Sequence, residues 1–334
     1  MSAITNYLLR DMLKPQKPPP KPVVFPAQVS ARALLEKDLP PRALILDPIL
    51  TRGTLAMLYG PRGLGKTFVA LGIAWAVASG NRFLGWQATR PHRVLYIDGE
   101  MAAVDMKERL RLLGPAPDTL DFLIADLEIK GLPDLADKEG QKALLAGWKE
   151  AGGKPDLLVL DNLSSLVGFS RNDPDPWMSM QRFLMVMRRI GVAVLVVHHA
   201  NKDGHQRGTS RREDILDLVL SIRRPSDYQP QEGARFELHF EKARGLMGDA
   251  VEPIEARMTP GEASGVKWDW RPAQFGELDR AVVLLNQGMN PSQVARELGI
   301  SAAKSYRFRK QAVEMGLVAP EPQIKPQSAK ASPA

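Results

Sequence analysis

The chain has no cysteine and no long apolar run, and each absence excludes classes of function. Without cysteine there is no disulfide scaffold, no thiol nucleophile and no cysteine-based zinc or iron–sulfur site. The longest strongly apolar stretch, Phe68–Ala78, is too short to span a bilayer, and the N-terminus lacks a signal-peptide pattern. We therefore expect a soluble cytoplasmic protein with no membrane partner.

Over most of the chain, acidic and basic side chains are equal in number. Residues 48–270 are neutral, so the net charge of +7 comes from the two ends, with +3 over residues 1–47 and +4 over residues 271–334. Basic ends indicate a polyanionic partner. Apolar residues make up 44% and charged residues 25% of the chain, which are ordinary globular values and exclude disorder over most of its 334 residues.

Composition divides the chain into four parts. Residues 1–33 are predicted to be an N-terminal arm with a Pro-rich linker, because Pro15–Pro26 holds six prolines in twelve residues. Residues 34–270 alternate short apolar runs with helical patterns, which is typical of an α/β domain with a mainly parallel sheet. Residues 276–318 have an all-helical pattern, and residues 319–334 are predicted to form a disordered tail.

Within the α/β domain, apolar periodicity predicts eight strands and four helices. The last strands have no helices between them, so we expect antiparallel hairpins at the edge of the sheet. The expected strands are Leu55–Tyr59, Val94–Ile97, Phe122–Ala125, Leu157–Leu160, Val192–Val197, Asp217–Ile222, Arg235–Glu241 and Ile254–Met258, and the expected helices are Thr67–Ser79, Ala102–Leu113, Lys138–Ala151 and Pro176–Ile190.

A phosphate-binding loop follows the first of these strands. The segment Gly60–Thr67 fits the pattern G-x-x-x-x-G-K-[ST], and it lies between an apolar run and an apolar-periodic helix. Glycines let successive N–H groups curl around phosphates, the lysine places a positive charge on the β- and γ-phosphates, and the threonine hydroxyl is a magnesium ligand. The residues expected to bind ATP are Gly60, Pro61, Arg62, Gly63, Leu64, Gly65, Lys66, Thr67 and Phe68.

A second magnesium ligand is expected at Asp161. It ends the apolar run Leu157–Leu160, which has the form of a Walker B strand, and a carboxylate there holds magnesium through water. With Thr67 it makes the expected metal site. A hydrophobic run that ends in Asp is also common at ordinary strand ends. The assignment of Asp161 as a magnesium ligand therefore depends on the P-loop about 95 residues upstream.

Hydrolysis also needs a group that orients and deprotonates water. Many P-loop enzymes place Glu directly after the Walker B aspartate, but here that residue is Asn162. The alternative is Glu100, which follows the run Val94–Gly99. If that strand lies beside the P-loop strand, its carboxyl end points Glu100 at the γ-phosphate. Glu100 could instead be an acid at a helix N-terminus, favoured by the helix dipole without a catalytic role.

Taken together, these motifs resemble a RecA-like P-loop ATPase of the RepA-type plasmid helicase family, which is related to DnaB and KaiC. The resemblance covers about Leu34 to Trp270. In chain order it rests on the P-loop Gly60–Thr67, the strand end Tyr96–Glu100, the Walker B strand Leu157–Asp161, the segment His198–Lys202 and the K-x-R element Lys242–Arg244. It implies magnesium-ATP hydrolysed between subunits of a ring of about six or of a filament, with single-stranded nucleic acid in a central channel.

The same resemblance implies further catalytic residues. It assigns Lys66 and Glu100 to catalysis, His199 to sensing the γ-phosphate, and Lys242 with Arg244 to completing a neighbouring subunit's site. Adjacent strand residues point to opposite faces, so only one of His198 and His199 can meet the nucleotide. A packed, hydrogen-bonded histidine and a solvated edge strand remain the alternatives for these positions.

A basic loop follows the expected sensor. Residues 201–212 are polar and contain Lys202, Arg207, Arg211 and Arg212. In RecA-like relatives the corresponding loop lines the channel and grips backbone phosphates, so we expect these four residues to contact single-stranded DNA. A solvated connection with incidental charge is the alternative.

The C-terminal module has the pattern of a helix-turn-helix. Three short helices are expected at Leu278–Leu285, Ser292–Leu298 and Ala302–Met315, with a tight turn at Gly299 and Ser301 as N-cap. The last helix is expected to place Lys304, Ser305, Arg307, Arg309 and Lys310 on an exposed face suited to duplex DNA. A helical cap for oligomer contacts is the alternative.

Three functions fit these features. The leading hypothesis is a magnesium-ATP-dependent, DNA-associated ATPase, namely a RepA-like helicase or replication ATPase of a bacterial mobile element. The second is an ATP-gated, sequence-specific DNA-binding regulator without unwinding activity. The third is an ATPase that acts on proteins, in which both basic regions are incidental.

Overall fold

The computed structural model describes residues 28–168, 176–199, 214–225, 228–261, 265–273, 277–314 and 316–319. The chain divides into two units, Met1–Pro41 and Arg42–Ala334, and residues 28–41 are the described part of the first. In it, helix α2 (Ala31–Leu35) begins after Ser30, whose hydroxyl accepts a hydrogen bond from the Ala33 N–H at 3.1 Å. The limit expected at residue 34 falls inside this helix, and the Pro-rich linker lies outside the described residues.

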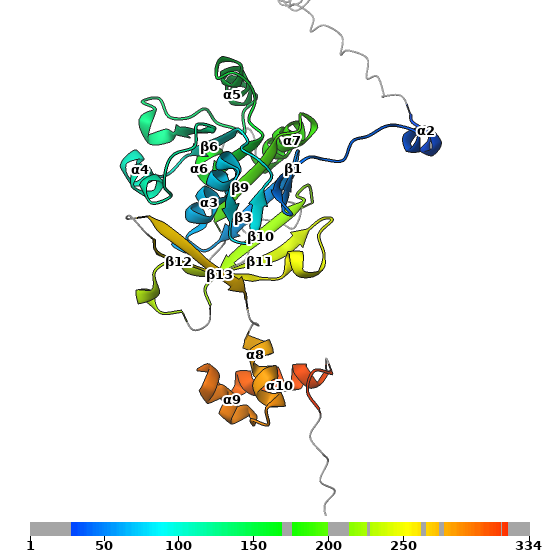
Figure 1. Cartoon of the computed structure of the whole chain (residues 1–334), viewed down its shortest axis with the longest axis vertical. Coiled ribbons are helices and arrows are strands. Elements are labelled where there is room, and N and C mark those ends of the chain that lie inside the picture. The colour runs from blue at the N-terminus through cyan, green and yellow to red at the C-terminus, as the bar shows by residue number, and fades with distance from the viewer. Residues whose placement is uncertain are drawn as a thin grey trace, which may run out of the picture. The chain divides into compact units, whose positions relative to one another are not determined.

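The core is a nine-stranded sheet with strand order β13-β12-β11-β10-β3-β9-β8-β6-β7 (Figure 1). Neighbouring strands from β10 to β7 pair in parallel, and β11 to β13 are added as antiparallel strands at one edge. The α/β class, the mainly parallel sheet and the antiparallel edge are therefore confirmed. The strands are β3 (Leu55–Gly60), β6 (Val94–Asp98), β7 (Leu120–Ile124), β8 (Leu157–Asp161), β9 (Ala193–His199), β10 (Leu218–Arg223), β11 (Arg235–Ala243), β12 (Ile254–Pro260) and β13 (Val266–Pro272).

Helices cover both faces of this sheet, because the central strands are apolar on both sides. In β3, Ala56 and Leu58 pack on one face with α3, while Leu55 and Met57 pack on the other. The first face is covered by α3 (Lys66–Ser79) and α4 (Ala103–Arg111), and the second by α5 (Lys138–Glu150), α6 (Leu163–Leu166) and α7 (Pro176–Arg189). Among the described residues, every helix is too short or too polar to cross a bilayer.

Five strands were not expected from the sequence. One is β13, in which Trp268 packs edge-on against Phe83 with ring centroids 5.4 Å apart. The other four form a small antiparallel sheet of order β2-β1-β5-β4, comprising β1 (Leu44–Asp47), β2 (Leu50–Thr51), β4 (Arg82–Phe83) and β5 (Trp86–Ala88). Its apolar side chains join the core on the α3 face.

The C-terminal helices form a small bundle of their own, comprising α8 (Glu277–Asn286), α9 (Pro291–Leu298) and α10 (Ala302–Glu314). Helix α9 begins with a capping box between Asn290 and Gln293 and ends at Gly299, whose φ of 64° turns the chain toward α10. The Ser301 hydroxyl accepts a hydrogen bond from the Lys304 N–H at 3.2 Å, as expected for an N-cap. The bundle core contains Ala281, Leu285, Val294, Ala312 and Val318.

Candidate nucleotide site

The P-loop joins the carboxyl end of β3 to the amino end of α3. Gly60 ends the strand where a Cβ atom would lie 2.4 Å from the Ile222 Cγ2 atom on β10, so a larger residue would force the two strands apart. Gly65 directly precedes α3 with a φ of 95°, a conformation that favours glycine. The loop therefore turns tightly into a helix whose N-terminal N–H groups can face an anion.

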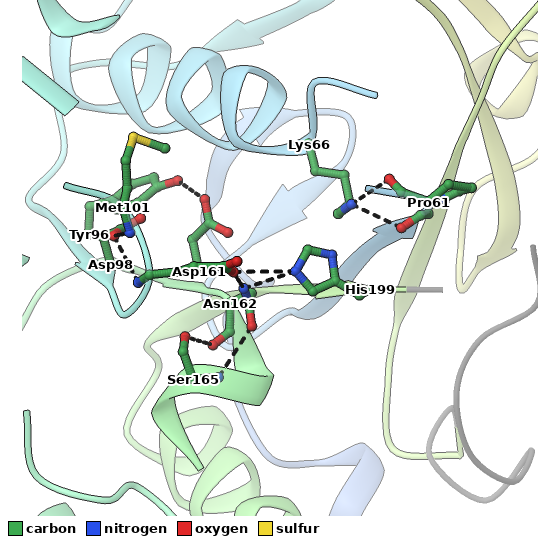
Figure 2. A network of polar contacts seen from close by, with 11 residues as sticks. Pro61, Lys66, Tyr96, Asp98, Met101, Asp161, Asn162, Ser165 and His199 are labelled. Atoms are coloured by element: carbon green, nitrogen blue, oxygen red, sulfur yellow. Dashed lines mark hydrogen bonds and ion pairs between the residues drawn. The ribbon is translucent and has the colours of Figure 1, made fainter. Parts of the chain in front are cut away.

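Lys66 is held at the centre of this loop and is only 5% exposed (Figure 2). Its Nζ donates to the carbonyl oxygens of Gly60 at 2.9 Å and Pro61 at 2.7 Å. Burial lowers the pKa of Lys66 to about 8, although the nearby carboxylates of Asp161 and Glu100 act in the opposite direction. A bound polyanion would favour the charged form of this amine.

Asp161, the last residue of β8, faces the P-loop and is 5% exposed. Tyr96 on β6 donates its hydroxyl to Asp161 Oδ2 at 2.6 Å, and the Thr67 side chain also hydrogen-bonds to this carboxylate. Burial raises the pKa of Asp161, and these hydrogen bonds and the Lys66 charge oppose the rise. The contact with Tyr96 was not expected from the sequence.

The oxygen donors of Thr67 and Asp161 fit a magnesium ion. Mg²⁺ prefers oxygen ligands and is usually held by one or two protein groups together with substrate phosphates and water. The described residues contain no group of three or more His, Cys, Asp or Glu side chains that could hold a metal by themselves. The donor set thus suits an ion brought in with a triphosphate rather than one caged by protein alone.

Glu100, Asn162 and His199 form a second cluster, and Figure 2 shows Asn162 and His199 beside Lys66. The Asn162 Nδ2 atom contacts Glu100 Oε2 and lies 3.1 Å from His199 Nε2, while Glu100 Oε2 lies 3.4 Å from the same histidine nitrogen. The Ser165 N–H donates to Asn162 Oδ1 at 3.3 Å, which directs the amide nitrogen toward Glu100 and His199. His199 Nε2 thus lies between an amide N–H, which can only donate, and a carboxylate oxygen, which can only accept, so the tautomer of His199 decides which of the two it bonds.

The surroundings of His199 favour its neutral form. Burial lowers its pKa, the charge of Lys66 lowers it further, and the hydrogen bond with Glu100 opposes both. Its Nδ1 atom is buried and has no hydrogen-bond partner among the described residues. Of the two adjacent histidines, His199 lies in this cluster, while His198 is 4% exposed.

Asp98 holds the turn that carries Glu100, and the sequence did not point to it. Its carboxylate accepts the N–H groups of Glu100 at 3.1 Å and Met101 at 2.7 Å. It is 2% exposed, and burial raises its pKa to about 6 although these two hydrogen bonds lower it. Between Asp98 and Glu100, Gly99 packs so closely that a Cβ atom would lie 2.4 Å from the Ser165 Oγ atom.

Glu100 was expected at the γ-phosphate on the condition that its strand lies beside the P-loop strand. That condition is wrong. Strand β6 does not lie beside the P-loop strand β3, because β9 and β8 lie between them. Glu100 still reaches the site, since the carboxyl ends of parallel strands meet at one edge of a sheet. The Glu100 side chain is 58% exposed there, so a ligand or a water molecule can reach it.

Lys242 and Arg244 lie far from this edge. Strand β11 ends at Ala243, so Lys242 lies on the strand and Arg244 follows its end. Ala243 is opposite Leu218, which pairs with Ala56 near the amino end of β3. The two side chains approach one point, the Asp214 carbonyl oxygen, at 3.5 Å from Lys242 Nζ and 2.9 Å from Arg244 Nη2.

The expected DNA contacts are only partly within the described residues. Lys202, Arg207, Arg211 and Arg212 lie outside them. In α10, Arg307 and Lys310 are exposed, whereas Lys304 and Arg309 are half-buried and Lys304 lies over the Phe308 ring. Ser305 is fully buried, so its expected place on the exposed face is wrong.

Comparison with known proteins gives one family and several relatives. A family model described as an AAA domain matches residues 19–205, more than half of the chain. The DNA repair protein RadA of Brucella abortus (strain 2308) is 26% identical over 174 residues, which are 51% of this chain and 33% of that protein. The DNA repair protein RadA of Aquifex aeolicus (strain VF5) is 25% identical over 197 residues, which are 57% of this chain and 36% of that protein.

The chain thus spans about a third of the length of the curated relatives it matches. Among solved structures, a KaiC-like protein from the hyperthermophilic archaeon Pyrococcus horikoshii OT3 is similar over 67% of this chain and 93% of that chain, with a TM-score of 0.47 and 13% sequence identity.

Proposed function

We propose that this chain, which belongs to the AAA domain family, is a RecA-like P-loop ATPase that hydrolyses magnesium-ATP and acts on DNA, as a RepA-like helicase or replication ATPase of a bacterial mobile element. The observation that carries the proposal is the meeting of Lys66, Asp161 and Glu100 at one edge of the sheet. They come from α3, from β8 and from the turn after β6, and the charges of both carboxylates act on the Lys66 amine.

Lys66, Thr67 and Asp161 bind and orient the triphosphate. The main-chain N–H groups of the P-loop and the Lys66 amine hold the phosphates. Thr67 and Asp161 would hold Mg²⁺, which neutralises phosphate charge when bound. Tyr96 keeps the Asp161 carboxylate in place through the 2.6 Å hydrogen bond.

Glu100 is the proposed general base. Its carboxylate orients the attacking water and accepts a proton from it, while the Asn162 amide keeps the carboxylate turned toward His199. His199 Nε2 lies within hydrogen-bond distance of both Asn162 Nδ2 and Glu100 Oε2, so a ligand that competes for any of these groups changes the position of Glu100. We propose that His199 senses the γ-phosphate in this way.

Lys242 and Arg244 are proposed to serve a neighbouring subunit. They lie at the amino end of the parallel strands, opposite the P-loop edge of the same subunit, so they cannot reach their own phosphates. Ring assembly brings one subunit's face against the next, and a ring of about six subunits would place these cations at the adjacent site. This proposal predicts that isolated subunits hydrolyse ATP slowly.

A DNA partner is supported by charge and by the relatives. Both curated relatives are named DNA repair proteins. The basic residues Lys202, Arg207, Arg211 and Arg212 directly follow β9, the strand that ends in His199, and are proposed to hold single-stranded DNA. The C-terminal helices are proposed as a helix-turn-helix for duplex DNA, with Arg307 and Lys310 exposed on α10 and Lys304 and Arg309 beside them.

A forked-duplex unwinding assay tests this function. Wild-type protein with magnesium-ATP is expected to separate the strands, and Glu100→Gln protein, which keeps the P-loop, is expected to bind the fork without separating it. If wild-type protein hydrolyses ATP and binds duplex DNA but separates no strands, the helicase proposal fails and the ATP-gated regulator takes its place.

A further inference from the structure

A largely buried ion pair lies next to Arg244 at the amino end of the sheet. Asp217 directly precedes β10, and Arg188 lies in the last turn of α7. The Arg188 Nη2 atom is 2.6 Å from Asp217 Oδ2, and the two side chains are 18% and 16% exposed. Because most of each side chain is removed from water, loss of either partner would leave a costly unpaired charge.

The Arg188 guanidinium is also held by groups other than Asp217. Its Nη2 atom donates to the Ile215 carbonyl oxygen at 2.7 Å, and its Nη1 atom lies 3.7 Å from Met185 Sδ. The main chain of Arg188 packs against the turn before β3, where a Cβ atom on Gly53 would lie 2.8 Å from the Arg188 carbonyl oxygen. The guanidinium that binds the carboxylate is therefore fixed in place.

The two carboxylate oxygens of Asp217 face different partners. Oδ2 accepts the Arg188 guanidinium and the Leu55 N–H, the latter at 3.0 Å. Oδ1 faces Arg244, whose Nη1 atom lies 3.9 Å away, beyond hydrogen-bond distance. The Arg244 side chain is 53% exposed, and its Nη2 atom donates to the neutral Asp214 carbonyl oxygen at 2.9 Å. Most of the Arg244 charge is therefore left uncompensated.

Two guanidinium groups thus compete for one carboxylate, and Arg188 has the advantage. Coulomb attraction weakens with distance and with exposure to water, and Arg188 is both nearer and more buried than Arg244. Without Arg188, the Asp217 carboxylate would be unpaired and largely buried. Arg244, its other ion-pair partner in the described part of the chain, would then be drawn toward it and away from solvent.

We propose that Arg188 is a positioning residue for Arg244. By binding the Asp217 carboxylate, Arg188 prevents that carboxylate from withdrawing Arg244 onto its own subunit, so the Arg244 guanidinium stays available to the phosphates of a neighbouring subunit. The inference rests on the proposed role of Arg244 at the neighbouring site. Since Arg188 acts through Arg244, its loss should slow turnover without weakening ATP binding to its own subunit.

Steady-state ATPase rates and calorimetric ATP binding of the full chain, both with Mg²⁺, test this role. Arg188→Met should bind ATP like wild type and lower kcat at least about tenfold, since a displacement of about 1 Å can cost about 100-fold. The double variant Arg188→Met/Asp217→Asn should regain most of the lost rate, because the carboxylate that withdraws Arg244 is gone. Asp217→Asn alone should turn over ATP like wild type.

A mixing experiment distinguishes a role toward the neighbour from a role within the same subunit. Arg188→Met protein keeps its own P-loop, and Lys66→Ala protein keeps Arg244 in its normal position. Their mixture should therefore regain activity at hybrid interfaces. A defect confined to the nucleotide site of the Arg188→Met subunit would not be restored in this way.

Two further variants complete the experiment. Arg52 pairs at 2.7 Å with Asp156, which directly precedes β8 as Asp217 precedes β10, so Arg52→Met is a matched control and should change neither kcat nor ATP binding. Arg188→Lys keeps a cation beside Asp217 and should turn over ATP faster than Arg188→Met.

Three results would overturn the role of Arg188. They are wild-type turnover in Arg188→Met, loss of ATP binding in that variant, and a lost rate that neither Asp217→Asn nor mixing restores. The proposed function fails in a different way. If Arg244→Ala protein turns over ATP like wild type, the role of Arg244 at a neighbouring site is wrong, and if wild-type protein binds no ATP, the ATPase function itself is wrong.

Discussion

Removing the Tyr96 hydroxyl would disturb the magnesium ligand without touching the P-loop. Tyr96 is fully buried, and its hydroxyl donates to Asp161 Oδ2 at 2.6 Å. Its ring also packs against Phe122 with centroids 5.3 Å apart. Tyr96→Phe keeps the ring and its packing, so the change is confined to one hydrogen bond.

The magnitude follows from the charge of the acceptor and its burial. A hydrogen bond to a charged group contributes more than one between neutral groups, and we expect Tyr96→Phe to lower the free energy of unfolding by about 2 kcal/mol. For a domain of this size that corresponds to a fall in Tm of about 4–8 °C. The Tyr96 hydrogen bond lowers the pKa of Asp161, so its loss raises that pKa further.

The chemical consequence concerns pH and magnesium. With a higher pKa, Asp161 loses its charged form at a higher pH. The acid limb of the ATPase pH profile of Tyr96→Phe should therefore move to higher pH, and the variant should need a higher Mg²⁺ concentration than wild type for half-maximal activity. Thermal denaturation and ATPase rates measured against Mg²⁺ concentration give both readouts. Tyr306→Phe, at an exposed tyrosine of α10, is the control and should change neither. An unchanged Tm with an unchanged Mg²⁺ dependence in Tyr96→Phe would refute this reasoning.

Three further predictions concern the other residues of the site. Glu100→Gln should bind ATP like wild type and hydrolyse it at least about 100-fold more slowly, and undiminished turnover would remove Glu100 from the mechanism. Mixing Arg244→Ala with Lys66→Ala protein should restore part of the ATPase activity at hybrid interfaces, whereas a flat mixing curve would argue against a cation supplied by the neighbour. The raised pKa of Asp98, about 6 against an ordinary 3.8, means that folding favours its protonated form. Its contribution to stability is therefore present below about pH 4 and lost as the pH rises through about 6. Denaturant unfolding of Asp98→Asn should show a flatter pH dependence over that interval than wild type, and parallel curves would contradict the assignment.

Local patterns in the sequence predicted most of the core. The eight expected strands and four expected helices of the α/β domain all appear, because each has a clear apolar period and a turn signal at its ends. Strand β13 carries a readable signal too, since Val266, Trp268 and Trp270 alternate with charged residues. The strands of the small sheet are two to four residues long, too short to show a period.

The order of the strands could not be predicted from such patterns. Two strands, β9 and β8, come between β3 and β6, and nothing in the local sequence marks this. The contacts between neighbouring strands follow from that order, so Tyr96 against Asp161 and Asn162 against His199 became visible only in the structure. Glu100 lies near Lys66 and His199 for a more general reason, because every parallel strand ends at the same edge.

The sequence also could not predict which residues of a single helix are buried. Ser305 has a polar side chain in a basic stretch, which favours an exposed position, yet it lies in the interior of the C-terminal bundle with Ala312. Of the basic residues expected on the exposed face of α10, Arg307 and Lys310 are exposed, and Lys304 and Arg309 are half-buried.

Isothermal titration of the purified chain with ATP in the presence of Mg²⁺ tests the central claim most directly. Wild-type protein should take up one nucleotide per subunit, and Lys66→Ala, which removes the buried amine at the head of α3, should take up none under the same conditions. Absence of any nucleotide uptake by the wild-type chain, or equal affinity in Lys66→Ala, would contradict the account.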